Sequence, residues 1–271
     1  MPEAASVTRE AIVHALATAL EPLPFVDAMW EAGAAAFRRV DEWSDIDLYA
    51  VVADDRIPET FRAVEDALAH LSPIRRKYEP AWPPESGTAQ AFYRIAGTSE
   101  HLLVDLAVFK RSAPNKFLEP ELHGEAVFSF NKGDAVQPPA LDLDAFVAKL
   151  VDRRDRLAAR VELFGPFVTK EIHRGNWLEA LAEYQVEVLD SLVQVLRMKY
   201  HPAHYGFRMR YVHYELPPEV VVRLERLSYV RDPEDLEMKY PEAVAWFREA
   251  VVGITEDEVR SRIRRTEPRP A

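Results

Sequence analysis

The sequence lacks cysteine, long apolar runs and an excess of basic residues. None of its 271 residues is a cysteine, which excludes disulfide bonds, thiolate zinc sites and a cysteine nucleophile. Its apolar runs fall far short of the roughly 20 residues that a membrane-spanning helix needs. The first ten residues also lack the basic-then-apolar layout of a signal peptide. We therefore expect a cytoplasmic protein that has no membrane partner.

The negative charge is concentrated in the first half of the chain. The formal net charge is -11. Residues 1–140 hold 22 acidic and 13 basic side chains, a difference of -9, whereas residues 141–271 hold 23 and 21, a difference of -2. A surface of this sign repels a phosphate backbone. We therefore expect no nucleic-acid partner, although an acidic surface is also ordinary for solubility.

The first half alternates segments of helical and of strand character. Apolar residues at helical spacing predict helices over 8–20 and 58–71. Runs rich in β-branched and aromatic residues predict strands over 25–31, 46–53, 89–96, 101–109 and 126–130. The Gly-Thr-Ser-Glu stretch at 97–100 is typical of a hairpin. These elements predict a mixed sheet with flanking helices.

The second half is helical almost throughout. Val-Gln-Pro-Pro at 136–139 has the composition of a linker. Amphipathic patterns then predict helices over 143–163, 177–200, 217–229 and 233–252, and the basic tail from Arg260 is expected to fray. The chain is thus predicted to be α+β, with an N-terminal sheet domain over 1–138 and a C-terminal helical bundle domain over 139–271.

Two aspartates at the start of a predicted strand are the first candidate for a site. Asp45 and Asp47 are two residues apart, so on a strand their side chains share a face. Neighbouring carboxylates repel each other, and a cation between them relieves the repulsion. Oxygen ligands of this kind suit Mg²⁺, which takes one or two carboxylates together with phosphates and waters.

A third acid and a glycine strengthen this interpretation. Asp105 is the only charged residue in the run 102–109, and a lone carboxylate among apolar neighbours is costly unless it is paired or bound to a metal. Pairing with an arginine is the alternative. Gly33 lies twelve residues before Asp45, and a residue without Cβ lets backbone amides approach a phosphate closely.

At this point the sequence resembles the nucleotidyltransferase superfamily related to DNA polymerase β. In its smaller bacterial members a Gly-Ser pair ends the first strand, Ser-Asp-x-Asp-Leu follows about ten residues later, and a third Asp lies on a later strand. The resemblance covers residues 25–109, about a third of the chain. The matching residues, in order and spacing, are Gly33, Ser44, Asp45, Asp47, Leu48 and Asp105.

The resemblance implies a nucleotidyltransferase fold and a two-metal phosphoryl transfer. Asp45 and Asp47 would hold two Mg²⁺ ions, and Asp105 would complete the site of one. A nucleoside monophosphate, AMP from ATP in the first instance, would pass to a hydroxyl of an acceptor. Gly33 and Ala34 would contact the triphosphate, while Ser44 would support the turn or a phosphate.

Two positions depart from the family pattern. The serine of the Gly-Ser pair is Ala34 here, which removes a hydroxyl contact to the triphosphate. A position that is often small in the family is Arg38, which would either clash with a phosphate or contact it. Outside the family motif, Lys132 lies in a turn-like stretch after a predicted strand and is a further candidate for a phosphate contact, with a plain turn as the alternative.

The helical half is the expected acceptor-binding domain. Family members that modify aminoglycosides or lincosamides, and so confer antibiotic resistance, have a helical domain after the catalytic one, with the acceptor between the two. The resemblance therefore implies a small-molecule acceptor, with an aminoglycoside as first candidate. An acidic face on the predicted helix 177–200 suits a polycation, and Glu183 is our candidate for the general base. A solvated surface is the alternative. The face consists of Glu179, Glu183, Glu187 and Asp190.

Three histidines near the end of that helix have no zinc-site spacing. His201, His204 and His213 lie among tyrosines and arginines, without a carboxylate at helical spacing between them. The wall of a polar pocket and ordinary packing between domains are both open.

Two other functions remain possible at this stage. One is a protein-adenylylating antitoxin of the minimal nucleotidyltransferase class, against which the fused helical half argues. The other is a catalytically degenerate nucleotide-binding module, which Ala34 and Arg38 motivate.

Overall fold

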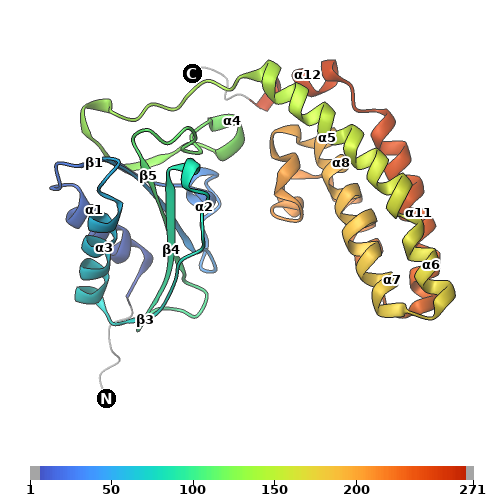
Figure 1. The fold of residues 1–271 in the computed structure, drawn as a ribbon, viewed down its shortest axis with the longest axis horizontal. Coiled ribbons are helices and arrows are strands. Elements are labelled where there is room, and N and C mark those ends of the chain that lie inside the picture. Colours follow the sequence, from blue (N-terminus) through green and yellow to red (C-terminus); the bar gives the residue numbers. More distant parts are fainter. Residues whose placement is uncertain (1–6, 267–271) are drawn as a thin grey trace. The chain divides into compact units, whose positions relative to one another are not determined.

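A computed structural model describes residues 7–266 of the chain, which form two compact units (Figure 1). The units divide between Ala140 and Leu141. The first is built on a six-stranded sheet, and the second is helical. The α+β class, the mixed sheet with flanking helices and the helical second region are thereby confirmed.

The sheet of the first unit has one parallel strand pair at its centre. The strand order is β3-β4-β5-β2-β1-β6. Only β2 and β5 run parallel among the described strands, and the other neighbours pair antiparallel. The strands are β1 (Val26–Glu31), β2 (Ile46–Val52), β3 (Ile74–Tyr78), β4 (Thr88–Ile95), β5 (Val104–Lys110) and β6 (Val127–Asn131).

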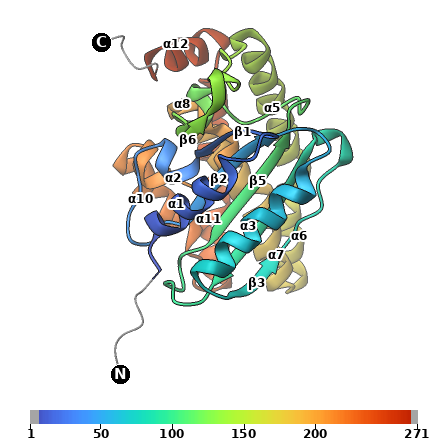
Figure 2. The same ribbon diagram turned by 90° about the vertical axis from the view of Figure 1, so that its left-hand side faces the viewer.

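Helices α1 (Arg9–Leu20) and α3 (Ile57–Leu71) cover one face of this sheet (Figure 2). The Thr8 side chain caps α1 by accepting from the amide of Ala11. Apolar residues at helical spacing on both helices pack against Ile46 and Leu48 of β2. Because side chains alternate along a strand, the residue between these two, Asp47, faces the opposite side of the sheet.

That opposite face carries an aromatic cluster. Trp30 lies edge-on to Tyr49 at 5.7 Å between ring centroids, and Phe109 lies beside both rings. The chain between β5 and β6, which includes the short helix α4 (Pro120–His123), contributes Leu118 to the same cluster. The cluster supports the sheet beside Asp47 and its neighbours.

The helical unit is organised around α8. Every residue of this helix from Ser191 to Met198 is buried, as expected for a central helix surrounded by others. The helices are α5 (Leu143–Phe164), α6 (Pro166–Arg174), α7 (Trp177–Glu183), α8 (Asp190–Tyr200), α9 (Val212–Glu215), α10 (Pro218–Ser228), α11 (Pro233–Val252) and α12 (Glu256–Thr266).

The structure corrects three expectations. The predicted helix 177–200 is divided into α7 and α8 by a π-helical segment, Tyr184–Leu189. Strand β3 was missed, because three of its five residues are basic and it lies at the edge of the sheet. The predicted fraying from Arg260 is wrong up to Thr266, since α12 continues to that residue and Val259 and Ile263 anchor it in the core. Residues 267–271 lie outside the described residues.

In the described part of the chain, no helix combines the length and apolar character that crossing a bilayer requires.

Candidate active site

The parallel strand pair places two acidic side chains next to each other. Asp47 of β2 is the direct register partner of Asp105 of β5, and adjacent strands lie about 4.8 Å apart. Both residues are partly buried, and they face the side of the sheet opposite α1 and α3. Asp45 immediately precedes β2, two residues before Asp47. The structure thus brings Asp47 and Asp105 together, and Asp45 lies two residues along the chain from this pair.

The backbone at Asp45 is anchored from α1. The guanidinium of Arg9 donates to the carbonyl oxygen of Asp45 and pairs with Glu31 at the end of β1. The Arg9 and Glu31 side chains are only 14% and 17% exposed. This pair fixes the point at which the chain enters β2, and nothing in the sequence pattern indicated it.

The position of Gly33 disfavours any residue with a side chain. Its φ is +51°, and a Cβ built there would lie 1.7 Å from Oδ2 of Asp47 and 2.5 Å from its Cγ. The amide of the preceding Ala32 donates to the carbonyl oxygen of Asp47 at 2.9 Å. Glycine is therefore required here by the close approach of the Asp47 carboxylate as well as by the backbone conformation.

Gly33 also begins a short helical turn, α2 (Gly33–Ala36). The amides of Ala35 and Ala36 donate to the carbonyl of Ala32, and that of Phe37 to the carbonyl of Gly33. The first amides of a helical turn have no acceptor within it, and in α2 these are the amides of Gly33 and Ala34. The Ala34 side chain is 8% exposed, so the methyl group lies inside and does not project from the turn.

Two further residues singled out by the sequence, Ser44 and Arg38, take part in local contacts. The Ser44 hydroxyl donates to Oδ1 of Asp41 at 2.7 Å and accepts from the amide of Asp41 at 2.9 Å. Arg38, at φ +57°, is exposed and pairs with Glu125 at 2.9 Å. Ser44 thus supports the turn before β2, one of the two roles expected of it, and the guanidinium of Arg38 is engaged by an acid.

Lys132 is placed differently from the expectation. Its ammonium donates to the carbonyl oxygens of Leu23 and Val26 at 2.6 Å each. Val26 is the first residue of β1, whereas Gly33 follows the last one, and five residues of strand span about 16 Å. Lys132 therefore stabilises the far end of β1, and we leave it out of the nucleotide site.

Sequence reasoning missed one polar neighbour of the acids. The side-chain amide of Gln90, on β4, donates to Oδ1 of Asp105 at 2.6 Å. The available signal was a polar residue on the strand before Asp105. The contact between Gln90 and Asp105 could not be inferred from this signal alone, because it depends on the pairing of β4 with β5, which places the two residues on one face.

The carboxylates near the beginning of the central strands β2 and β5 fit a divalent cation. They lie at adjacent positions of one face, partly shielded from water. Mg²⁺ prefers such hard oxygen ligands, and it commonly uses only one or two carboxylates per ion. The Asp47 carboxylate can lie against the backbone of Gly33 because that residue has no side chain.

In the helical unit, the predicted acidic face is partly neutralised. Arg160 of α5 makes a two-pronged contact with Glu187, and Arg208 pairs with Asp190 at 2.6 Å. The hydrogen bond from Arg160 to Glu187 raises the pKa of the guanidinium, with further contributions from the charges of Asp190 and Glu183. Glu183 itself is partly buried at the end of α7, and its role as a base stays a prediction.

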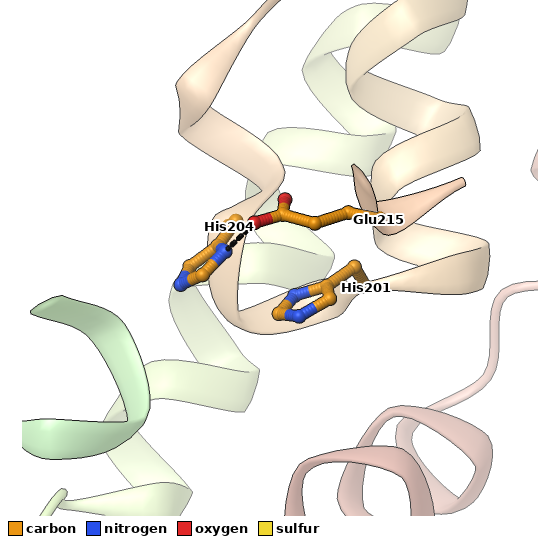
Figure 3. A group of neighbouring side chains, drawn as sticks. All are labelled: His201, His204 and Glu215. Atoms are coloured by element: carbon orange, nitrogen blue, oxygen red, sulfur yellow. Dashed lines mark hydrogen bonds and ion pairs between the residues drawn. The ribbon is translucent and has the colours of Figure 1, made fainter. Parts of the chain in front are cut away.

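A buried group of ligand-type side chains lies elsewhere in the same unit (Figure 3). His204 hydrogen-bonds one oxygen of Glu215 at 2.9 Å, and the buried guanidinium of Arg197 pairs with the other at 2.6 Å. The rings of His201 and His204 stack at 4.2 Å with an angle of 16°. Nitrogens of nearly parallel rings do not converge on one tetrahedral ion. We therefore interpret the group as an ion-pair network that joins α8 to α9.

His213 does not belong to this network. Its ring is exposed and lies 3.9 Å from Glu225. Burial lowers the pKa of His201 to about 4, and the neighbouring His204 adds to the shift. Because His213 contacts a different acid from His204, the three histidines form no common site in the described structure.

The comparisons with known proteins concern the fold. No protein-family model matches the sequence, and no curated protein matches it at a significant level. Among solved structures, the chain is similar to an aminoglycoside 6-adenyltransferase from Bacillus subtilis, at 15% identity and a TM-score of 0.36 over 95% of this chain and 90% of that chain.

It is also similar to the spectinomycin adenyltransferase AAD(9) from Enterococcus faecialis, solved with ATP and spectinomycin. Here the identity is 10% and the TM-score 0.36, over 95% of this chain and all of the other. Both are antibiotic nucleotidyltransferases. No residue role or substrate is transferred from these two proteins to this chain.

Proposed function

We propose that the protein is a Mg²⁺-dependent nucleotidyltransferase. The observation that carries the proposal is the direct pairing of Asp47 with Asp105 across β2 and β5, with the Asp47 carboxylate lying directly against Gly33. Two carboxylates at neighbouring positions of one face repel each other, and a divalent cation beside them relieves that repulsion. Hard oxygen ligands of this kind suit Mg²⁺.

The residues of the first unit have separate tasks in this proposal. Asp45, Asp47 and Asp105 would hold the metal, and Mg²⁺ bound there would supply neutralisation of triphosphate charge. The amides of Gly33 and Ala34 would contact phosphate oxygens. Arg9 and Glu31 would keep the backbone of Asp45 in place, as they do in the structure.

We propose ATP as the donor and a hydroxyl of a small molecule as the acceptor. We also propose that the protein acts in the cytoplasm, where ATP is available. Aminoglycoside-type compounds stand first in the acceptor panel, on the resemblance of the motif. In the helical unit, Glu179 and Glu183 are the acids of the predicted face for which no ion pair is found among the described residues. Glu183 is retained as the candidate base.

Calorimetry with ATP and Mg²⁺ tests the proposal. The wild type should bind ATP in a Mg²⁺-dependent manner, and Asp47→Asn combined with Asp45→Asn should abolish that dependence. Asp134→Asn is a matched control, because Asp134 lies in the turn after β6 and not beside Asp47 and Asp105. Equal Mg²⁺-dependent binding by the wild type and the double variant would rule out the metal site.

A second candidate is a module that binds nucleotide without transferring it. The buried methyl group of Ala34 favours this candidate, because the turn lacks a hydroxyl for the triphosphate. Mass spectrometry of an acceptor library incubated with the four nucleoside triphosphates and Mg²⁺ separates the two. One acceptor that gains a nucleoside monophosphate would eliminate the binding module.

A further inference from the structure

We propose that Gln90 is a positioning residue for the metal-binding carboxylate Asp105, and that Trp82 in turn orients Gln90. The inference rests on the proposed function of the carboxylate site. It adds two residues that the nucleotidyltransferase motif does not contain.

The contacts form a short chain that ends at the carboxylate. The indole N–H of Trp82 donates to Oε1 of Gln90 at 3.2 Å, and Nε2 of Gln90 donates to Oδ1 of Asp105 at 2.6 Å. An amide side chain has one acceptor and two donor hydrogens. With its oxygen occupied by the indole, the amide has to present its nitrogen to Asp105, so Trp82 determines which way Gln90 faces.

The sheet register shows why Gln90 reaches this position. Phe92 of β4 is the direct partner of Asp105, and Gln90 is the partner of Ala107. Gln90 is therefore diagonal to Asp105 on the same face, within reach of a long side chain. Asp47 is the partner of Asp105 on the other side, across β2. Asp105 thus lies between the second acid and the amide that holds it.

The chemical type of this neighbour matters. A neutral amide restricts the rotation of a carboxylate by a charge-assisted hydrogen bond and leaves its negative charge in place. A lysine or arginine at position 90 would restrict it equally well but would compete with a cation for the charge. Partners that orient metal ligands typically affect metal affinity by 10–100-fold when they are removed.

Mn²⁺ binding measures the inference without any catalytic assay. Free Mn²⁺ is followed by electron paramagnetic resonance during titration of the full-length protein, for the wild type, Gln90→Leu, Gln90→Asn and Trp82→Phe. We expect Gln90→Leu to weaken Mn²⁺ affinity by about 10–100-fold. Gln90→Asn, which keeps the amide but shortens its reach by one methylene, should weaken it as well, and Trp82→Phe should do so by a smaller factor.

Thr88→Val is the matched control. Thr88 lies two residues from Gln90 on the same face of β4, and its hydroxyl donates to the carbonyl of Ser86. The control loses one side-chain hydrogen bond of the strand without touching an acid, so its Mn²⁺ affinity should equal that of the wild type. Thermal unfolding of all variants separates a loss of metal affinity from a loss of fold.

The possible results separate the two proposals. If the wild type and Asp105→Asn differ in Mn²⁺ affinity but both Gln90 variants bind like the wild type, the positioning role is refuted and the metal site stands. If Gln90→Leu does not fold, Gln90→Asn decides in the same way. If the wild type binds no Mn²⁺, with or without ATP, the proposed function fails and this inference fails with it.

Discussion

The two units of the protein arrange their acidic side chains differently. In the helical unit, Glu215 is 1% exposed and is matched by the fully buried Arg197 and by His204. In the sheet unit, Asp47 and Asp105 lie beside each other, and the contacts around them include a neutral amide and a glycine. The first arrangement joins one acid to two basic side chains. The second places two acids at neighbouring positions of one face of the sheet.

This contrast separates a structural cluster from a candidate site. Residue type alone favours the histidine and glutamate group as a metal centre, because imidazoles are common metal ligands. The guanidinium of Arg197, however, also donates to the carbonyl oxygens of Arg208 and Arg210, where the backbone is at φ +54° at Arg208. The network thus stabilises a loop with a strained backbone, and we propose the cation site at Asp47 and Asp105 instead.

The largest effect on stability is expected at Glu215. Glu215→Gln leaves Arg197 buried without a carboxylate, and the loss of one partner of a buried pair costs about 3–5 kcal/mol. Peptide-resolved hydrogen exchange of α8 should show this loss. Glu242→Gln, which removes partly exposed pairs with Arg223 and Arg226, should cost about 1 kcal/mol or less.

The same measurement on Asp47→Asn tests the other side of the comparison. Asp47→Asn keeps the shape of the side chain and removes one of two neighbouring negative charges, so it should lower the unfolding free energy clearly less than Glu215→Gln does. A loss as large as that of Glu215→Gln would mean that Asp47 belongs to a structural network, and the contrast between the units would collapse.

The next effect concerns nucleotide affinity at Gly33. A methyl group there collides with the Asp47 carboxylate, so Gly33→Ala should reduce Mg²⁺-dependent ATP affinity by about 100-fold, which corresponds to roughly 2.7 kcal/mol. Calorimetry measures this reduction.

Gly133→Ala is an unusually close control. Gly133 has φ +56°, close to the +51° of Gly33, and nothing lies within 4 Å of the added Cβ. Both variants should lose about 1 kcal/mol of stability because of the left-handed conformation. Only Gly33→Ala should lose ATP affinity, and equal affinity in the two variants would contradict the site.

A smaller effect is expected from pH in the helical unit. The pKa of His201 is lowered to about 4 by burial, so the unfolded chain takes up a proton at higher pH than the folded one. Stability should therefore fall as the pH falls from about 6.5 to about 4, by something on the order of 2 kcal/mol. Above pH 6.5 the residue is neutral in both states and contributes no pH dependence.

His201→Asn should reduce this pH dependence, as followed by hydrogen exchange of α8 at several pH values. The exposed His173 on α6 provides the control, and His173→Asn should leave the wild-type profile unchanged. An unaltered profile in His201→Asn would show that other groups dominate the acid sensitivity of the network.

The smallest effect is expected at Ser44. Ser44→Ala removes two hydrogen bonds to Asp41 and should cost about 1 kcal/mol of stability. If the hydroxyl serves the turn alone, ATP affinity in calorimetry should change by no more than about twofold. A tenfold loss of affinity would instead assign Ser44 to a phosphate contact.

Helical spacing and runs of β-branched and aromatic residues predicted most of the fold, because the central strands of the sheet are largely buried and apolar. The edge strand β3 has no such run, since Arg75, Arg76 and Lys77 follow one another. The π-helical segment before α8 could not be predicted from the sequence either, because its residues continue the helical pattern on both sides.

For the candidate site, the sequence supplied the residues that lie close in the chain or in a motif. Asp45, Asp47, Asp105 and Gly33 followed from charge, spacing and resemblance. Gln90 and Arg9 did not, because their contacts depend on strand pairing and helix packing across long separations. Lys132 was predicted near a phosphate because it lies in a turn after a strand. The sequence did not indicate which end of β1 this turn approaches.

The most direct test of the account is the anomalous scattering of Mn²⁺ in a crystal of the protein grown with a non-hydrolysable ATP analogue. We predict a peak at the edge of β2 and β5, within about 2.5 Å of carboxylate oxygens of Asp47 and Asp105, with the triphosphate at Gly33. A Mn²⁺ peak at His201 and Glu215 instead, with nothing at the paired aspartates, would contradict it.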